Sequence, residues 1–349
     1  MKRCIALLLA LILTLPLLAC AKEEEVREKL GGIHTESGDV YPETFLTFDR
    51  QEVTFDEFRY FYLNYRDMHL ENDSSYFEKE GAEDSLKSEV LGYLRDNWAL
   101  RFLAKENKVT LNREEKEAIK ADMEEAAAVF GSEEAFINDL HASYMSQNYY
   151  EDMMEYASLS YKLFNKLFEE GGKEAYSDQE FYDFFEANYL AVQQIYLPFE
   201  EGESAENYPK TKAAAESIRL EAEGGTDFWS LVEKYGKDEN MLSSPDGYYF
   251  TQGQAEDVLY EASKALKTGE ISQPVAGQTG VYLIRRMEMK KARMDENRDV
   301  ALFGYRDTMD EWHPGEYDRV FQELIRKRAE KIKVTESEYW DMVSTKTVY

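Results

Sequence analysis

The sequence predicts an α+β protein in which helical segments flank one compact module that contains the main strands. Two observations support this prediction. Apolar residues recur at helical spacing, with recognisable helix starts, over residues 54–187 and again after residue 291. Residues 191–290 instead mix strand-like runs, a few helices and several glycines. A length of 349 residues also favours two domains rather than one.

The first twenty residues, MKRCIALLLALILTLPLLAC, join Lys2 and Arg3 to an apolar run that ends at Cys20. A short basic start followed by an apolar core predicts a secretory signal. The ending Leu-Leu-Ala-Cys resembles a bacterial lipobox, which implies cleavage before Cys20 and lipidation of its thiol. We therefore expect a signal peptide over residues 1–19 and a lipid anchor on Cys20. An ordinary signal peptide with an incidental cysteine is the alternative.

Cysteine usage and charge narrow the function classes. Cys4 leaves with the signal and Cys20 carries lipid, so the mature chain is expected to form no disulfide.

The chain has 70 acidic and 41 basic residues, a net charge of −29. Such a surface repels the phosphates of nucleic acids and favours basic clients, so we expect no nucleic-acid partner. A lineage-wide acidic bias is the alternative explanation of the charge. A charged fraction of 32% excludes a multi-span membrane protein.

Residues 20–43 are polar, carry Gly31-Gly32 and lack a sustained apolar period, which predicts a flexible tether. Order is expected to begin with a small hairpin, in which residues 45–48 form a strand, Asp49-Arg50 a turn and Val53 the return strand. Thr54 and Glu57 have the spacing of a capping box and begin a helix. Its inward apolar positions are Phe55, Phe58, Tyr62 and Tyr65.

Further helices are predicted over residues 86–106, after the Asn112/Glu115 capping box, from Ser132, over residues 146–172, and after the Ser177/Glu180 capping box. The long helix over residues 146–172 is expected to stop at Gly171-Gly172. The residues on its inward face are predicted to be Met153, Ala157, Tyr161, Phe164 and Phe168.

After residue 291 the pattern is helical again, with an amphipathic stripe between Tyr317 and Ile332. Thr335 and Glu338 are interpreted as the capping box of a last short helix. We expect a helical domain over residues 44–187, a mixed domain over residues 188–290, and C-terminal helices over residues 291–349 that pack back on the helical domain, because neither apolar stripe can stay in water.

The middle module resembles the parvulin family of prolyl isomerases through ordered pieces rather than one motif. These are VQQIYLPF from residue 192, the helical run AAAESIRLEAEGGTDFWSLVEKYG from residue 213, DGYYFTQGQ from residue 246, and ALKTGEISQPVAGQTGVYLIRR from residue 265. They resemble the family's opening strand, its two helices, its DLGxFxxGQ turn and its closing strands. The resemblance implies a small antiparallel sheet flanked by helices.

The arrangement around the module is similar to foldase lipoproteins of the PrsA and SurA type. A lipobox, a small hairpin, a helical domain with FGSEEAF, the inserted parvulin module and a returning C-terminal helix follow one another in that order. This resemblance implies a SurA-like helical chaperone domain and an extracytoplasmic, lipid-anchored protein on a bacterial cell membrane. The partners that it implies are unfolded or newly secreted polypeptides, and the membrane through lipid on Cys20. The sequence leaves the oligomeric state open, and a homodimer is one alternative.

The parvulin resemblance assigns four positions to the catalytic site: Gln194, Asp238, Thr279 and Tyr282. The family's two histidines align with Gln194 and Tyr282. Asp238 and Thr279 keep residue types that the family allows. The four histidines of the chain all lie outside residues 191–290. Because an amide and a phenol each donate and accept hydrogen bonds, Gln194 and Tyr282 could pair with each other.

The same resemblance places the substrate pocket at Phe250, Gln254, Ala255 and Leu259. A methionine and a phenylalanine of the family become Ala255 and Leu259, which removes apolar contact with a proline ring. No phosphate loop, HExxH, paired CxxC or GxSxG motif is present in the sequence, so no cofactor and no metal are expected.

Three hypotheses follow. The first is a membrane-anchored folding factor that binds unfolded secreted chains mainly through its helical domain, with a parvulin module of weak or lost activity. The second is an active prolyl isomerase that uses Gln194, Asp238, Thr279 and Tyr282. The third is a structural envelope lipoprotein with one dedicated partner. The tyrosine-rich run at residues 58–65 is interpreted as a helix–helix core, with a groove for unfolded chains as the alternative.

Overall fold

The computed structural model describes residues 28–349, which form two compact units. The terminal unit comprises the described residues up to 159 together with residues 329–349, and the central unit comprises residues 160–328. The predicted signal peptide and the predicted lipidation site Cys20 lie outside the described residues. Within residues 28–349, no helix has both the length and the apolar character that a membrane span requires.

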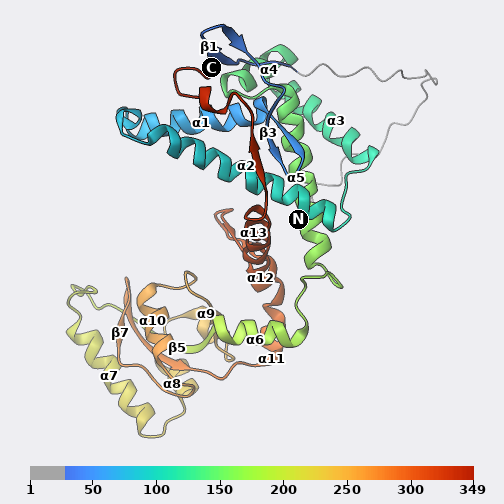
Figure 1. The fold of residues 1–349 in the computed structure, drawn as a ribbon. Coiled ribbons are helices and arrows are strands. Elements are labelled where there is room, and N and C mark those ends of the chain that lie inside the picture. Colours follow the sequence, from blue (N-terminus) through green and yellow to red (C-terminus); the bar gives the residue numbers. More distant parts are fainter. Residues whose placement is uncertain (1–27) are drawn as a thin grey trace. The chain divides into compact units, whose positions relative to one another are not determined.

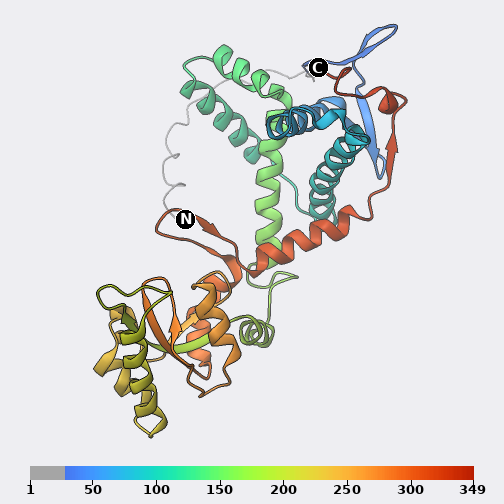
Figure 2. The same ribbon diagram turned by 90° about the vertical axis from the view of Figure 1, so that its left-hand side faces the viewer.

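The terminal unit is mostly helical, and its helix starts follow from the capping residues. Thr54 accepts a hydrogen bond from the backbone N–H of Glu57, and Asn112 and Glu115 form a reciprocal capping box. Ser132 caps the next helix through the N–H of Ala135. These helices are α1 (Phe55–Asn72), α2 (Ala82–Glu106), α3 (Arg113–Val129) and α4 (Glu133–Ala142), with the short η1 (Tyr76–Glu78) between α1 and α2. Helix α5 (Gln147–Phe168) follows, and its residues from 160 onward belong to the central unit. Figures 1 and 2 show these helices in blue to green.

A three-stranded sheet contains strands from both chain segments of the terminal unit, the one that ends at residue 159 and the one over residues 329–349. The predicted hairpin is present as β3 (Thr44–Phe48) and β4 (Gln51–Thr54), and β11 (Val334–Glu336) pairs with β3 on its other edge. Thr335 lies opposite Thr47 in this sheet, so the predicted helix from Thr335 is wrong. Residues 334–336 instead satisfy the open edge of β3, visible as the red strand beside the blue ones in Figure 2. Only the short 3₁₀ turn η2 (Trp340–Met342) follows.

Ordered structure begins before residue 44. Strands β1 (Ile33–Thr35) and β2 (Gly38–Val40) form a hairpin inside the segment predicted as a tether over residues 20–43. Ile33 is fully buried, and Gly32 exchanges two backbone hydrogen bonds of 3.2 Å with Tyr349. The local polar composition did not indicate this order because the stabilising partner comes from the far end of the chain.

Helix α5 starts and ends close to its predicted limits, but its buried face differs from the prediction. Tyr161 is 66% exposed, whereas Leu163, Leu167 and Phe168 are buried. Phe168 stacks on Tyr317 at a centroid distance of 4.7 Å. The prediction of an inward Tyr161 is therefore wrong, since the inward face of this half of the helix follows Leu163 and Leu167 instead.

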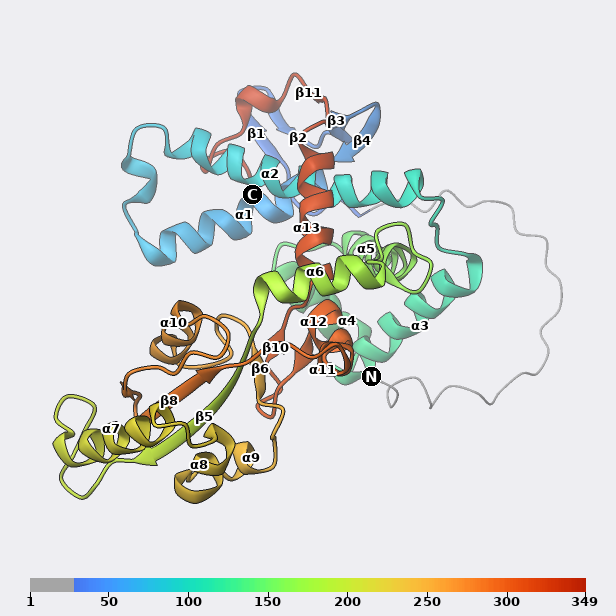
Figure 3. The same cartoon turned by 90° about the horizontal axis from the view of Figure 1, so that it is seen from below.

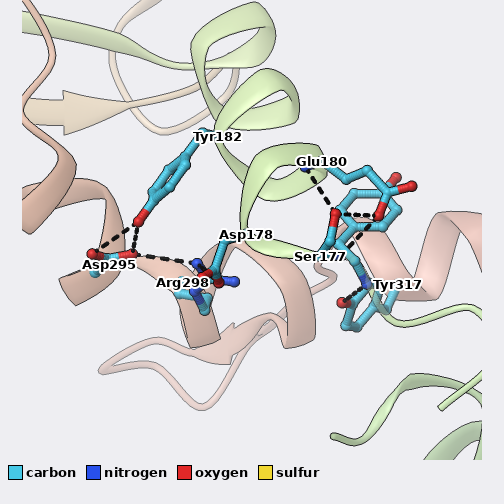
Figure 4. Close-up of polar contacts among 8 residues, drawn as sticks. Ser177, Asp178, Glu180, Tyr182, Asp295, Arg298 and Tyr317 are labelled. Atoms are coloured by element: carbon cyan, nitrogen blue, oxygen red, sulfur yellow. Dashed lines mark hydrogen bonds and ion pairs between the residues drawn. The ribbon is translucent and has the colours of Figure 1, made fainter. Parts of the chain in front are cut away.

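The central unit includes segments on both sides of the predicted mixed domain. These are α6 (Asp178–Asn188), α11 (Lys291–Glu296), α12 (Arg298–Phe303), the β9 (Tyr305–Arg306) and β10 (Trp312–His313) hairpin, and most of α13 (Glu316–Ala329). The Tyr182 hydroxyl donates to Asp295 at 3.0 Å, and Arg298 pairs with Asp178 at 2.9 Å (Figure 4). These contacts fasten α6 to α11 and α12. The two compact units meet at residues 159/160 and 328/329, and the expected domain boundaries at 187/188 and 290/291 stay a prediction.

The predicted small antiparallel sheet of the mixed domain is confirmed. Its strand order is β6 (Tyr248–Phe250), β5 (Leu190–Pro198), β8 (Gly280–Arg286) and β7 (Val275–Ala276), and every pairing is antiparallel. Helices α7 (Pro209–Glu223), α8 (Phe228–Tyr235) and the short α9 (Glu239–Leu242) contribute to the core on one face, and α10 (Asp257–Ala265) to that on the other. Figures 1 and 3 show α10 and α7 on opposite sides of the strands.

Candidate functional site

Strand β5 sends its two adjacent glutamines to opposite faces of the sheet. Gln193 shares a face with Ile195, and its amide nitrogen donates to the carbonyl of Pro245 at 2.7 Å. Gln194 shares the other face with Val192 and lies opposite Ile284 of β8. Gln193 is 4% exposed, while Gln194 is half-buried at the edge of a cleft.

The cleft beside Gln194 has a volume of about 560 Å³ and lies within the central unit. Six of the eight positions that the sequence assigned to the catalytic and substrate-binding groups line it, namely Gln194, Phe250, Gln254, Ala255, Leu259 and Tyr282. The structure therefore brings together residues that span almost ninety positions of the chain. Leu259 and Phe250 form its apolar floor with the core of the α10 face.

Asp238 lies behind the cleft with both carboxylate oxygens occupied. Its Oδ1 accepts the backbone N–H groups of Asn240 and Met241, which makes Asp238 the N-cap of α9. Its Oδ2 accepts a hydrogen bond of 2.9 Å from the Gln194 amide and another of 2.9 Å from the Tyr248 hydroxyl. Asp238 thus holds the backbone turn and two side chains in place, and it is not among the residues that line the cleft.

Tyr282 lies on β8, the strand that pairs with β5, and Thr279 directly precedes that strand. The Tyr282 ring is 5.0 Å from the Tyr196 ring, and burial, followed by the negative charge of Glu256, raises the pKa of the Tyr282 hydroxyl. The Thr279 hydroxyl accepts a hydrogen bond of 3.1 Å from Tyr196 and does not line the cleft. Gln194 donates to Asp238 rather than to Tyr282, so the pairing considered from the sequence is replaced by a Gln194–Asp238–Tyr248 network.

Tyr248 is a site residue that the sequence did not indicate, although it stands where the resembled turn has a glycine. Burial, and then the hydrogen bond to Asp238, raises the pKa of its hydroxyl. The preceding Gly247 has φ +85°, and a Cβ there would lie 2.5 Å from the carbonyl oxygen of Val192. The positive φ at position 247 favours a glycine there, and the neighbouring Tyr248 directs its hydroxyl to Asp238.

Two charged residues also line the cleft and were not predicted: Glu256, just before α10, and Arg293 of α11. For metals, the described residues place ligand atoms of Asp307, Glu311 and His313 within 4.8 Å of one another. That group lies on the β9–β10 hairpin and does not line the cleft. His313 already contacts Asp307 at 3.2 Å, and we assign the group no metal role.

Comparison with known proteins agrees with the parvulin resemblance. Residues 184–290 match the family model described as the PPIC-type PPIASE domain. The foldase protein PrsA of Bacillus subtilis is 29% identical over 90 residues, which is 26% of this chain and 31% of that protein. The chaperone SurA of Chromohalobacter salexigens is 30% identical over 104 residues, which is 30% of this chain and 23% of that protein. The chain thus spans about a third or less of the length of these curated relatives.

Among solved structures, the peptidylprolyl isomerase PrsA from Bacillus cereus overlaps 87% of this chain and 87% of its own chain, at 15% identity and a TM-score of 0.31. PrsA from Bacillus subtilis overlaps 91% of this chain and 99% of its own, at 17% identity and a TM-score of 0.27.

Proposed function

Because residues 184–290 match the PPIC-type domain of prolyl isomerases, we propose that this chain is an extracytoplasmic folding factor that binds unfolded or newly secreted polypeptides. Its parvulin-like cleft binds proline-containing segments and catalyses their isomerisation weakly or not at all. Lipid on Cys20 would hold the protein at the outer face of the cell membrane, and a second acyl chain would make that attachment lasting. Homology to foldases and a chaperone supports the general class.

The observation that carries the proposal is that both carboxylate oxygens of Asp238 already accept hydrogen bonds from the protein itself. Rotation about a prolyl bond must overcome a barrier of about 18–20 kcal/mol. A catalyst lowers it by offering polar groups to the twisted amide in a closed site. Here the Asp238 carboxylate accepts hydrogen bonds from the Gln194 amide and the Tyr248 hydroxyl, and the histidines of the resembled site are absent. A cleft of about 560 Å³ remains for binding.

The terminal unit offers an aromatic surface that supports the chaperone role. Tyr93 of α2 is 45% exposed, and it stacks against Tyr65 at 4.8 Å and Phe61 at 6.1 Å. Met68, three residues beyond Tyr65 on α1, is also exposed. Phe58 and Tyr62 from the same run are fully buried and serve the core. Exposed tyrosines next to apolar side chains bind varied segments of unfolded chains because each ring offers both an apolar face and a hydroxyl.

Two assays on the same preparation test the proposal. At equimolar amounts the full chain should suppress aggregation of a denatured client, while peptide cis–trans isomerisation should stay within about twofold of the uncatalysed rate, which is well under 1 kcal/mol of barrier lowering. The double variant Gln194→His/Tyr282→His restores the two imidazoles and should raise the isomerisation rate above that of the wild type. Tyr161→Phe, on the exposed side of α5, is the matched control for both assays.

The alternatives give different results in the same assays. Clear isomerase activity in the wild type that is lost in folded Asp238→Asn would establish the active-isomerase hypothesis instead. Absence of protection for every denatured client, together with capture of one stoichiometric partner, would favour the structural lipoprotein.

A further inference from the structure

Glu256 places a carboxylate in the cleft through its position at the start of α10. It is the residue before the helix, yet its side chain does not cap the helix backbone. Its Oε2 instead accepts the backbone N–H of Gln278 at 2.9 Å, from the loop that leads into β8. The carboxylate is thus held between two elements while it lines the cleft with Gln194 and Tyr282.

Gly277 shows how closely the Glu256 carboxylate approaches Tyr282. A Cβ at position 277 would lie 2.8 Å from Cε2 of Tyr282 and 2.9 Å from Oε2 of Glu256. Both groups therefore pack around the same point of the backbone, and a side chain at position 277 would require the Glu256 carboxylate or the Tyr282 ring to shift. The negative charge of Glu256 also acts on Tyr282, where it adds to the effect of burial in raising the pKa of the phenol.

Within residues 28–349, no lysine, arginine or histidine forms an ion pair with Glu256. The other charged residue that lines the cleft, Arg293, pairs with Glu296 of its own helix and lies 5.8 Å from the centre of the Tyr249 ring. Arg293 is therefore already paired with a carboxylate, whereas the Glu256 carboxylate accepts only a backbone N–H from the described residues. A half-buried carboxylate in this state interacts more strongly with an incoming cation than a fully solvated one does.

We propose that Glu256 makes the cleft select proline segments that carry a lysine or arginine directly next to the proline. This inference rests on the proposed binding of polypeptides in the cleft and adds the substrate class. A basic side chain beside the proline would pair with Glu256 while the ring lies against Leu259 and Phe250. A glutamate at the same place in the peptide would meet like charge and lose affinity.

Labelled octapeptides with one central proline test the proposal on the full chain by fluorescence anisotropy at low ionic strength. The flanking residue is lysine, alanine or glutamate, placed before or after the proline in separate peptides. We expect the better lysine peptide to bind about tenfold more tightly than its glutamate counterpart, the size of a partly buried charge pair. Glu256→Gln, which keeps an oxygen for the Gln278 N–H, should reduce this ratio to about twofold, and Glu256→Lys should reverse it.

Glu261→Gln is the matched control, because Glu261 is an exposed acid on the same helix that does not line the cleft. It should leave the ratio unchanged. The backbone amide resonance of Gln278 should shift more with the lysine peptide than with the alanine peptide, which places the cation at Glu256.

Equal affinities for all peptides, or equal losses in Glu256→Gln and Glu261→Gln, would overturn the proposal and leave the folding-factor function standing if denatured clients are still protected. Absence of both peptide binding and client protection would remove the two together.

Discussion

The two faces of the β5–β8 sheet are built in different ways. The face toward α7 and α8 is a closed apolar core in which Ile195, Val281 and Leu283 are fully buried. The face toward α10 is a smaller core around Val192 and Ile284 that opens into the cleft beside Gln194 and Tyr282. Residues of both kinds alternate along the same two strands.

The two faces have different roles: the closed face holds most of the apolar core, and the open face carries the cleft. The closed face buries apolar side chains of β5 and β8 against those of α7 and α8, and this burial stabilises the fold. On the open face, Gln194 and Tyr248 both donate hydrogen bonds to Asp238 beside the cleft. The apolar core and the polar groups of the cleft thus lie on opposite faces of the same two strands.

The largest expected effect tests this separation on one leucine from each face. Leu283→Ala removes a fully buried side chain from the closed core and should destabilise the central unit by about 3–5 kcal/mol. Leu259→Ala should destabilise it by about 2 kcal/mol, because Leu259 lines the cleft and water can enter the space that it leaves. Hydrogen exchange of the β5 and β8 amides measures both. Equal losses of protection would show that the two faces contribute alike.

The next effect concerns the hydrogen bonds that Asp238 accepts beside the cleft. Tyr248→Phe removes one hydrogen bond to Asp238 and should destabilise the central unit by about 1 kcal/mol at pH 7. The pKa of the Tyr248 hydroxyl is raised in the folded state, so the folded chain keeps this proton when the unfolded chain loses it near pH 10. The stabilisation is complete below about pH 10 and falls as the pH rises further.

Urea unfolding from pH 7 to pH 11 measures this dependence. The wild type should lose stability above about pH 10 more steeply than Tyr248→Phe does, because the variant lacks one of the raised groups. Tyr161→Phe, at an exposed position of α5, controls for the loss of a tyrosine as such. Parallel curves for wild type and Tyr248→Phe would mean that the bond to Asp238 contributes nothing to folding.

The sequence predicted the frame of the site better than its hydrogen bonds. Ordered motifs gave the sheet and put Gln194 and Tyr282 on facing strands, since strand alternation and antiparallel pairing follow from local pattern. The partnership of Tyr248 with Asp238 could not be read from the sequence, because the two residues meet only through the turn between α9 and β6.

Errors elsewhere in the chain have the same origin. Thr335 and Glu338 have the spacing of a capping box, but the open edge of β3 draws residues 334–336 into a strand. The tether predicted over residues 20–43 includes the β1–β2 hairpin, which hydrogen-bonds to Tyr349. In both cases the deciding partner lies at the opposite end of the sequence, where no local pattern can indicate it.

The smallest expected effect comes from the one polar side chain on the closed face of β5. Gln193 is 4% exposed, its amide nitrogen bonds to Pro245, and its Oε1 has no hydrogen-bond partner among the described residues. An unpaired buried oxygen costs about 1–3 kcal/mol, while the single bond to Pro245 contributes about 1 kcal/mol. Gln193→Leu removes both and leaves the Pro245 carbonyl, in an exposed residue, free to bond to water.

Gln193→Leu should therefore change the free energy of unfolding by no more than about 1 kcal/mol, toward greater stability, and leave peptide binding in the cleft unchanged. Gln194→Leu, one residue along the strand, should weaken peptide binding because it takes a donor from Asp238 and a polar group from the cleft. Urea unfolding and peptide anisotropy on the two variants make the comparison. A loss of stability above about 2 kcal/mol in Gln193→Leu would mean that the closed face depends on a polar contact as well, since apolar burial alone predicts a gain.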